Sequence, residues 1–419
     1  MNLNQMRYGF SIAMFLVLNF VQGNPRDTVM SLQEVKARLI KSNLGLLAAH
    51  YDVNISKAAV IQARLWTNPY FVFNGDLYSM EENEYFHFRN QHLLQLEQTF
   101  SVAGKHTNSV KLATLGAEMA ERQLEDVLRS LIFETGNLYN DLAALQEKIG
   151  LYGQVLVSYE ELLASSRRQL EIGAISSTEA IRLQSEYLAI QTDALAIRNE
   201  REQVMADLRT LLRMPEDTVF LVEQRLPMIV QNLALSELVE RATAQRPDLL
   251  LQKQNIKFQE RNLKLQRSLA VPDIKLAYQP RDRGSNYVRP YQGFNVEFNL
   301  PLFNRNQGEI KSAQFQVVQS EILYDQSEIK VRNEVAAAYN RFVNSQKGLK
   351  NYDPDLLTRL KELNEGSTLN FQKRNISLLQ FIDYQRIFIQ TNAQLTELKQ
   401  EFLKNVNELN FVVGTGIIE

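Results

Sequence analysis

Residues 124–156 read LEDVLRSLIFETGNLYNDLAALQEKIGLYGQVL, and their apolar side chains recur at alternating steps of four and three. The positions that share this spacing are Leu124, Leu128, Leu131, Thr135, Leu138, Leu142, Leu145, Ile149, Tyr152 and Leu156. Such a sustained heptad seam is typical of a long helix that packs along another helix. The same spacing returns over residues 183–211, after a break at 173–176, which predicts a second helix running back along the first.

The sequence contains an internal repeat of two similar halves. Three nearly equal shifts align the halves over separate windows, namely 203 for residues 32–69, 200 for residues 96–113 and 201 for residues 175–208. Because these windows follow one another in chain order, the halves are expected to share one structure. We place the first repeat at 24–213 and the second at 234–419. Residues 214–233 are interpreted as a linker with one short strand.

Each repeat is expected to run helix, strand, strand, helix, helix. The first helices, over about 31–66 and 235–269, stop before prolines that cannot continue a helix. The expected strands lie at about 68–79, 85–100, 272–280 and 291–301. The expected long helices lie at 101–172, 176–213, 302–371 and 376–413, with an interruption near Asn351-Tyr352-Asp353-Pro354. This order predicts a mainly α chain built from a duplicated helix-strand-strand-helix-helix unit.

The expected strands have one apolar and one polar face. In the last of them Phe294, Val296 and Phe298 alternate with polar residues, which is the period of a half-exposed strand. The polar side chains expected to line a water-filled lumen are Gln95, Glu97, Asn295, Glu297 and Asn299. Open sheet edges are costly in lipid, so several copies of the chain must close one barrel. Two copies would give eight strands and three would give twelve.

The N-terminus has the pattern of an export signal. Arg7 precedes an apolar run over residues 8–21, and residues 21–23 offer a cleavage site, so we expect a signal peptide at 1–23. The run is too short to span a bilayer as a helix. A buried N-terminal helix is the alternative. No later stretch of about 18 apolar residues follows, so membrane insertion is expected to use strands.

Composition excludes several classes of protein. The chain of 419 residues has no cysteine, which excludes disulfides, thiolate metal sites and a lipid anchored on an N-terminal cysteine. Its 46 basic and 48 acidic side chains give a net charge of −2, which argues against nucleic acid as a partner. The four histidines lack metal-ligand spacing, and no nucleophile or phosphate-loop motif is present. We therefore expect neither an enzyme nor a bound metal or cofactor.

The order of these elements resembles the TolC-type outer-membrane efflux family. The resemblance rests on the proline-started strand pair, the long helix pair broken at residues 173–176, and the repetition of both in an exported chain. It implies a homotrimer in which four strands per chain form a twelve-stranded outer-membrane β-barrel and the long helices form a periplasmic α-barrel. It also implies an exit channel that passively conducts drugs or metal ions across the outer membrane of a Gram-negative-type cell. The implied partners are a periplasmic adaptor protein, an inner-membrane pump of the RND type and outer-membrane lipid.

Site residues follow from the same resemblance. The helical tips that contact the adaptor correspond to Gly173, Ala174, Ile175, Ser176, Arg374, Asn375, Ile376 and Ser377. The second tip lacks the glycine that is usual in the family. The periplasmic aperture corresponds to Asp383, with Gln380 one turn earlier and Glu179 as the repeat equivalent of Gln380. A ring of Asp383 carboxylates would favour cations.

Two other functions fit the same pattern. A periplasmic coiled-coil scaffold or adaptor without a pore would use only the heptad seams and the partners they bind. Recovery of the protein from the aqueous periplasm would favour it. A type I secretion exit duct would share the channel architecture, because in the family that the chain resembles the pump selects the cargo and the exit component does not.

Overall fold

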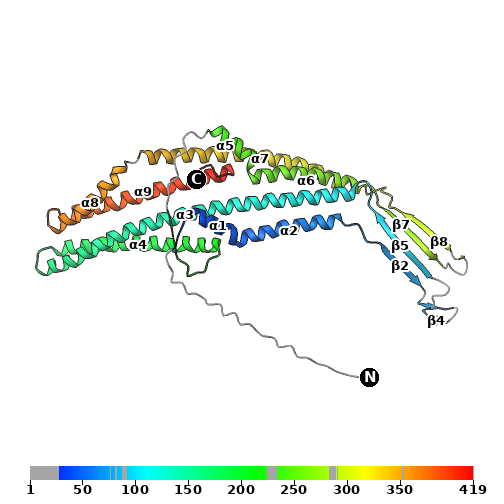
Figure 1. Cartoon of the computed structure of the whole chain (residues 1–419), viewed down its shortest axis with the longest axis horizontal. Helices are drawn as coiled ribbons and strands as arrows, with labels where there is room; N and C mark the ends of the chain where they lie inside the picture. Colours follow the sequence, from blue (N-terminus) through cyan, green and yellow to red (C-terminus); the bar gives the residue numbers. More distant parts are fainter. Residues whose placement is uncertain are drawn as a thin grey trace, which may run out of the picture.

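The computed structural model describes residues 28–75, 77–80, 83–86, 92–223, 234–282, 289, 291–351 and 353–418. The signal peptide expected at 1–23 lies outside these residues. The chain forms an elongated rod with the strands at one end and two helical hairpin tips at the other (Figure 1). Among the helices that are described, none has an apolar stretch long enough to cross a bilayer.

Helices make up most of the rod. The helices are α1 Leu32–Ser42, α2 Leu44–Arg64, α3 Lys105–Glu171, α4 Ser177–Leu212, α5 Leu235–Gln245, α6 Pro247–Leu269, α7 Gln307–Lys350, α8 Pro354–Gln372 and α9 Leu378–Val413. The strands are β1 Thr28–Met30, β2 Tyr70–Gly75, β3 Tyr78–Ser79, β4 Glu84–Tyr85, β5 His92–Phe100, β6 Phe220–Val222, β7 Ile274–Asp282 and β8 Tyr291–Glu297. The helices of the two repeats correspond by their order along the chain. Helices α1 and α2 correspond to α5 and α6, α3 corresponds to the pair α7 and α8, and α4 corresponds to α9.

Helix α3 is the longest element. Its 67 residues contain no proline, and at about 1.5 Å per residue they span roughly 100 Å. Helices α2 and α4 of its own repeat and α6 and α9 of the other repeat pack along it. At Gly136 a Cβ atom would lie 2.8 Å from the Asn407 side chain of α9. Glycine therefore permits this approach, in which Asn407 Nδ2 donates to Phe133 O (2.8 Å) and Asn137 Oδ1 (2.9 Å).

The outgoing helix of the second repeat, expected over 302–371 with an interruption near residues 351–354, consists of two helices. Helix α7 ends at Lys350 and α8 begins at Pro354. Proline in the first turn of α8 has no backbone N–H with which to continue α7. The Asp353 carboxylate caps the new start by accepting from Asp355 N (3.0 Å). The interruption predicted near residue 351 therefore separates two helices.

A buried polar residue divides each first helix into two. Asn43 separates α1 from α2 and Arg246 separates α5 from α6, so the single helices expected at these places are wrong. Asn43 Nδ2 donates to Leu211 O (2.9 Å), and Arg246 Nη1 donates to Val412 O (3.2 Å). The two acceptors differ by the shift of 201, so the bonds are equivalent under the repeat. Each break satisfies a carbonyl at the end of a returning helix, where intrahelical partners are lacking.

Arg246 is the centre of a buried ion cluster. Its side chain is only 4% exposed and forms ion pairs with Asp248 (2.6 Å) and Glu334 (2.7 Å). Arg129 of α3 lies 3.5 Å from the same Asp248 carboxylate. Burial alone would raise the pKa of Asp248, but hydrogen bonding and charge attraction from Arg246 outweigh it, and the pKa is lowered. The cluster ties α6 to both α3 and α7.

Four strands form one antiparallel sheet in the order β2-β5-β7-β8. The central pair, β5 and β7, joins the two repeats, and β2 and β8 are the outer strands. The register places Tyr70, Glu97, Ala277 and Asn295 side by side across the sheet. Because successive side chains point to opposite faces, this row shares one face with the residues two positions away.

The strand limits are tighter than expected. Strand β8 ends at Glu297, so Asn299 lies in the connection to α7 and its place in a strand was wrong. The reason is the partner strand, which begins at Ile274 directly after a proline-aspartate pair. In the first repeat, β2 and β5 stand in place of the longer strands expected at 68–79 and 85–100, with the two-residue strands β3 and β4 between them.

The short strand expected in the linker is β6. It pairs in parallel with β1, which brings the start of the described chain against the linker. Tyr139 of α3 holds both strands to the rod, because its hydroxyl lies within hydrogen-bond distance of Met30 O (3.0 Å) and Glu223 O (2.6 Å). Phe220 of β6 is buried in the same core as Leu208 and Leu212 of α4. The linker is therefore packed onto the first repeat.

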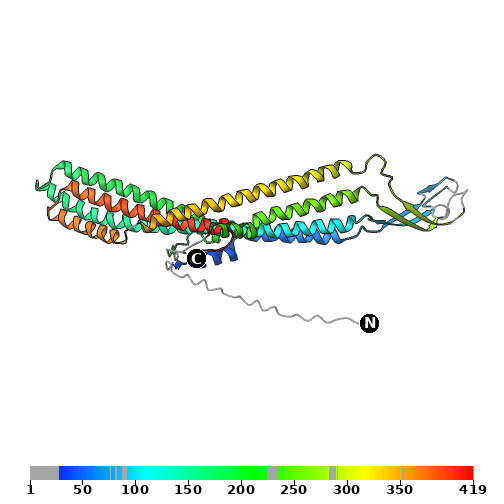
Figure 2. The ribbon, with the colours of Figure 1, turned by 90° about the horizontal axis from the view of Figure 1, so that it is seen from above.

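The helices are arranged differently at the two ends of the rod. Near the strands they form one layer in which α2 packs on α3, α3 on α6 and α6 on α7 (Figure 2). This order matches the order of the strands that they adjoin. Near the tips, α3, α4, α8 and α9 surround a core that includes Tyr159, Leu183 and Phe381. The two repeats thus lie side by side along the whole rod.

The Arg246→Ala change is expected to destabilise the protein by about 3 kcal/mol, because it leaves two partly buried carboxylates and a helix-terminal carbonyl without their cation. The change Asn43→Ala removes the equivalent uncharged bond and is expected to cost about 1 kcal/mol. Urea unfolding of the detergent-solubilised protein, followed by circular dichroism, measures both changes. Equal effects of the two substitutions would contradict the larger role given to the ion cluster.

Candidate functional site

Four of the residues expected to line a lumen lie on one face of the sheet. They are Gln95, Glu97, Asn295 and Glu297. Cross-strand contacts hold this face together, since Gln279 Nε2 donates to Gln95 Oε1 (2.9 Å) and Lys275 Nζ lies 3.5 Å from Glu97 Oε1. Lys275 also stands opposite Glu297 in the register of β7 and β8. This face is polar and carries charges of both signs.

The opposite face of the sheet is apolar and uncovered. Its side chains include Phe71, Leu96, Phe294 and Val296, which are between 51% and 64% exposed. An apolar face of this extent is a surface for lipid or protein. Strands β2 and β8 each have an outer edge without a paired strand among the described residues. The sheet of one chain is therefore unfinished both at its edges and on its apolar face.

The two helical tips have the same backbone. Gly173 has a φ of 69°, and its repeat equivalent Arg374 has a φ of 59°. The residue after each donates its N–H to a carbonyl five residues earlier, at 2.7 Å from Ala174 and 2.8 Å from Asn375. The missing glycine of the second tip therefore leaves the turn unchanged. An L-residue in this left-handed region costs about 1 kcal/mol or more relative to glycine.

Ser176 and Ser377 start the returning helices with the same cap. Ser176 Oγ accepts from Glu179 N (3.2 Å), and Ser176 N donates to the Glu179 carboxylate (2.9 Å). Gln380 repeats both bonds with Ser377 at 3.2 and 2.9 Å. The hydrogen bonds from the backbone and the hydroxyl of Ser176 lower the pKa of Glu179. Both side chains, which the sequence analysis assigned to an aperture, are thus engaged in helix caps.

A cavity of about 210 Å³ lies between the two tips. Its lining residues are Leu162, Ser165, Ser166, Gln169, Ala174, Ile175, Glu179, Leu183, Phe371, Gln372, Arg374, Ile376, Ser377 and Leu378. The expected tip residues Ile175 and Ile376 therefore meet at one place, although 201 positions separate them in the chain. No pattern in the sequence predicts the cavity between the two turns.

The carboxylates near the tips are dispersed. In the part of the chain that the structure describes, no three His, Asp or Glu side chains are placed to hold a metal ion. The Asp383 side chain is exposed on α9, and its carboxylate makes no hydrogen bond or ion pair with another described side chain, although its charge helps to raise the pKa of Arg386. Beside it, Arg386 forms a two-bond ion pair with Glu186 of α4, both bonds at 2.7 Å, which raises the pKa of Arg386. This ion pair was not predicted from the sequence. The signal that could have found it is the opposite charge of Glu186 and Arg386, which are 200 positions apart, close to the shift of 201 between the repeats.

Comparisons with known proteins agree with this geometry. A family model described as Outer membrane efflux protein matches residues 37–212 and 238–415, one match in each repeat. The chain is 21% identical over 394 residues to the cobalt-zinc-cadmium resistance protein CzcC of Cupriavidus metallidurans, over 93% of this chain and 92% of that protein. It is 21% identical over 316 residues to the proteases secretion protein PrtF of Dickeya chrysanthemi, over 71% of this chain and 67% of that protein. The crystal structure of the Campylobacter jejuni CmeC outer membrane channel superposes with a TM-score of 0.73 and 14% identity, over 99% of this chain and 94% of that chain.

Gly173→Ala is expected to weaken the first tip turn by about 1 kcal/mol, because alanine incurs the left-handed penalty that glycine avoids. Hydrogen exchange of the Ala174 amide, whose N–H closes the turn, should become about fivefold faster. Gly153→Ala is the matched control, since Gly153 lies within α3 with open space around a Cβ atom and should slow local exchange. Unchanged exchange at Ala174 would contradict the left-handed turn.

Proposed function

The chain belongs to the outer membrane efflux protein family and is an outer-membrane exit channel of a tripartite efflux system, and we propose how this channel is assembled and used. Three copies form one channel, an adaptor docks at the helical tips, and an inner-membrane pump of the RND type delivers the solute. The observation that carries this proposal is the sheet with one polar face, one apolar face and two open edges. A periplasmic scaffold without a pore is not favoured.

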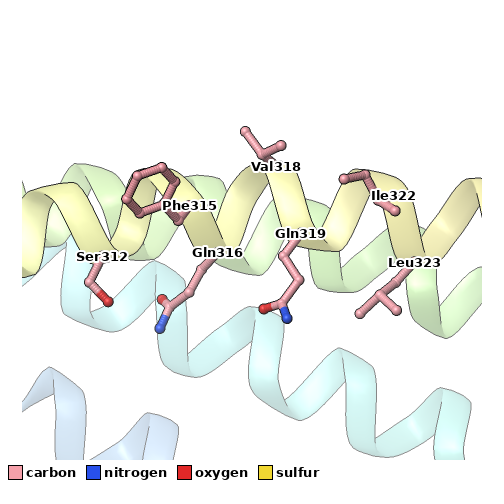
Figure 3. Close-up of a pocket in the computed structure, with 7 residues that line it drawn as sticks. All are labelled: Ser312, Phe315, Gln316, Val318, Gln319, Ile322 and Leu323. Carbon is pink, nitrogen blue, oxygen red and sulfur yellow. The ribbon is translucent and has the colours of Figure 1, made fainter.

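The layer of helices beside the sheet also has two outer edges, α2 and α7, that expose apolar side chains. Helix α2 exposes Tyr51 and Ile55, and α7 exposes Phe315, Val318 and Ile322. A shallow groove of about 580 Å³ runs along α7, and all of its lining residues belong to that one helix (Figure 3). In Figure 3 the side chain of Val318 is directed away from the neighbouring helices. The groove therefore has only one wall within a single chain.

The internal repeat supplies the second wall. Within one chain, α3 of the first repeat packs against α6 of the second. Helix α7 is the equivalent of α3, and α2 is the equivalent of α6, so α7 of one copy packs against α2 of the next. Leu115 of α3 is half-buried, whereas its equivalent Phe315 of α7 is 63% exposed in a single chain. Head-to-tail contacts of this kind generate a ring when the rotation closes.

One residue pair of this interface follows from the same equivalence. Gln254 of α6 donates a hydrogen bond to Glu118 of α3. The repeat equivalent of Gln254, 203 positions earlier, is Tyr51, and the repeat equivalent of Glu118, 200 positions later, is Val318. Both are more than half exposed in a single chain. A polar pair within the chain thus corresponds to an apolar pair between copies, and apolar contacts are typical of permanent interfaces.

Three copies supply twelve strands, enough for a barrel with a lumen. With the apolar face toward lipid, the face that carries Gln95, Glu97, Asn295 and Glu297 lines the water-filled passage. The long helices continue the wall into the periplasm. Solutes pass through this duct without chemical change, because the family is one of channels and the pump provides the driving force.

We assign small solutes, metal ions or drugs, as the cargo. The observation that favours them is the similarity to CzcC, a cobalt-zinc-cadmium resistance protein, over nearly the whole of both chains. The similarity to PrtF, a proteases secretion protein, spans 67% of that protein. It makes a type I secretion duct the second candidate. The pump chooses between such cargoes, and the duct does not.

We place the periplasmic aperture at Asp383. This carboxylate is exposed near the tips, and its neighbour Arg386 is already paired with Glu186. Asp383 is therefore available to a passing cation, and three copies would form an acidic ring. Glu179 and Gln380 belong to the rim of the tips, where they hold the helix caps.

Paired cysteines test the interface between copies, because the chain has no cysteine of its own. Tyr51→Cys combined with Val318→Cys is expected to form disulfides between chains under mild oxidation. Denaturing electrophoresis should then show a covalent species of three chains and none larger. Leu65→Cys with Val318→Cys is the control, since Leu65, which directly follows α2, lies roughly 21 Å from Tyr51 along the helix axis. Equal cross-linking of both pairs, or a ladder beyond three chains, would contradict the ring.

Asp383→Asn is expected to lower the preference of the reconstituted channel for cations over anions by about threefold, because each copy loses one carboxylate at the aperture. Reversal potentials in planar bilayers under a salt gradient measure this preference. Asp193→Asn, which removes an exposed carboxylate of α4, is the control and should leave the selectivity unchanged. If Asp383→Asn has the selectivity of the unchanged protein, Asp383 does not line the aperture.

A further inference from the structure

We propose that Lys275 sets the charge selectivity of the barrel, because it offsets carboxylates that would otherwise make the lumen more strongly negative. The inference rests on the proposed function, in which the polar face of the sheet lines the passage. It adds Lys275 to the residues expected to line the lumen, and it specifies the solutes that the barrel admits, which are anionic as well as cationic.

Three charged side chains lie on the half of the sheet that adjoins the helices. Across residues 70–72 of β2, 95–100 of β5, 274–279 of β7 and 293–297 of β8, they are Glu97, Lys275 and Glu297. The register and the alternation of side chains put all three on the polar face. Two carboxylates and one ammonium group give each chain a net charge of −1 here, and without Lys275 this charge would be −2.

Lys275 is paired with Glu97 across the boundary between the repeats. Its Nζ lies 3.5 Å from Glu97 Oε1, and Gln95 Nε2 donates to the other oxygen of the same carboxylate, Oε2 (3.4 Å). The Gln95 amide is held in turn by Gln279, whose Nε2 donates to Gln95 Oε1 (2.9 Å). A Cβ atom on Gly293 would lie 2.5 Å from Gln279 Oε1, so glycine leaves room for this amide. A continuous polar network thus fixes Glu97 beside Lys275.

The two side chains of this ion pair differ in exposure. The Glu97 side chain is 15% exposed, whereas that of Lys275 is 46% exposed. The ammonium group therefore stays in contact with the water of the lumen. A charge on the wall acts on ions in solution over about 10 Å at 0.1 M salt. Because a positive charge lowers the local concentration of cations and raises that of anions, Lys275 acts on passing solutes as well as on Glu97.

The ion pair next to this half of the sheet adds no net charge. Lys105 Nζ, at the start of α3, lies 2.6 Å from Asp273 Oδ1, directly before β7. The Lys105 side chain is only 10% exposed, so its ammonium group is turned to its partner and away from water. Lys105 therefore joins the helices to the sheet, and Lys275 is the exposed lysine of the lumen.

The internal repeat has the carboxylate twice and the lysine once. Glu97 has a carboxylate at its repeat equivalent, Glu297, 200 positions later, but Lys275 has Val72 at its equivalent, 203 positions earlier. In the proposed ring, β8 of one copy lies beside β2 of the next, as β5 lies beside β7 within a chain. Glu297 then meets Val72 where Glu97 meets Lys275. In this half of the sheet, Lys275 is therefore the single cation that offsets two carboxylates.

An introduced cysteine measures the potential beside Lys275, because the chain has no cysteine of its own. Asn295→Cys places a thiol on the polar face, diagonal to Lys275 across β7 and β8, at about 7–8 Å. Isolated outer membranes that contain the full-length variant are treated with methanethiosulfonate reagents of similar size and opposite charge. The ratio of the cationic to the anionic modification rate reports the potential, since a change in the pKa of the thiol affects both rates equally.

Lys275→Gln, made in the Asn295→Cys protein, is expected to raise this ratio about threefold, because one positive charge is lost beside the thiol. Lys275→Glu changes the charge by two and should raise the ratio about tenfold. Lys275→Arg keeps the charge and should leave the ratio unchanged, which separates charge from packing. Lys253→Gln is the matched control, since it removes an exposed lysine of α6 that lies roughly 24 Å from the last residue of that helix.

A second thiol separates this proposal from the proposed function. Val296→Cys carries its thiol on the apolar face and is expected to resist both reagents in the membrane, whereas Asn295→Cys reacts. Equal reactivity of these two thiols, or no reaction at Asn295→Cys, would contradict the water-filled lumen and both proposals with it. Reaction at Asn295→Cys with a ratio that Lys275→Gln leaves unchanged or lowers would overturn only the role of Lys275.

Discussion

Strands β2 and β8 end the sheet with backbone groups that have no partner strand within the described chain. In lipid each unpaired N–H or C=O group costs several kcal/mol, so such an edge does not persist there. The apolar face of the same sheet, which carries Phe71 and Phe294, is too extensive for a surface in contact with water. Both demands are met together when further copies extend the sheet until it closes. The helices that adjoin the strands must then form a ring as well.

The internal repeat makes that ring possible from one kind of contact. We propose that the packing of α3 on α6 inside the chain is repeated between copies, where α7 packs on α2 of the next copy, and the strands follow the same order. The polar breaks at Asn43 and Arg246 bind the last turns of the returning helices, so the two hairpins are held in equivalent positions. Helix α3 carries this arrangement over roughly 100 Å, from the sheet to the tips, without interruption.

Much of this architecture could be predicted, because heptads, alternating strands and a repeat are local or periodic signals. The breaks at Asn43 and Arg246 were not predicted. Pro247, directly after Arg246, marks the start of α6, but no proline follows Asn43, and the hydrogen-bond partners of both residues lie more than 160 residues away. Asn299 continued an alternating pattern beyond the point where its partner strand begins. At the tips, the turn residues were predicted from the resemblance, but the cap of Glu179 and the cavity beside Arg374 depend on how two distant hairpins meet. The aperture at Asp383 stays a prediction.

If several copies of this chain close one channel in the outer membrane, native mass spectrometry of the protein extracted by detergent from isolated outer membranes should find a species with the mass of three chains, each at most 48.3 kDa. A single chain, recovered from the aqueous periplasmic fraction and absent from the outer membrane, would contradict it.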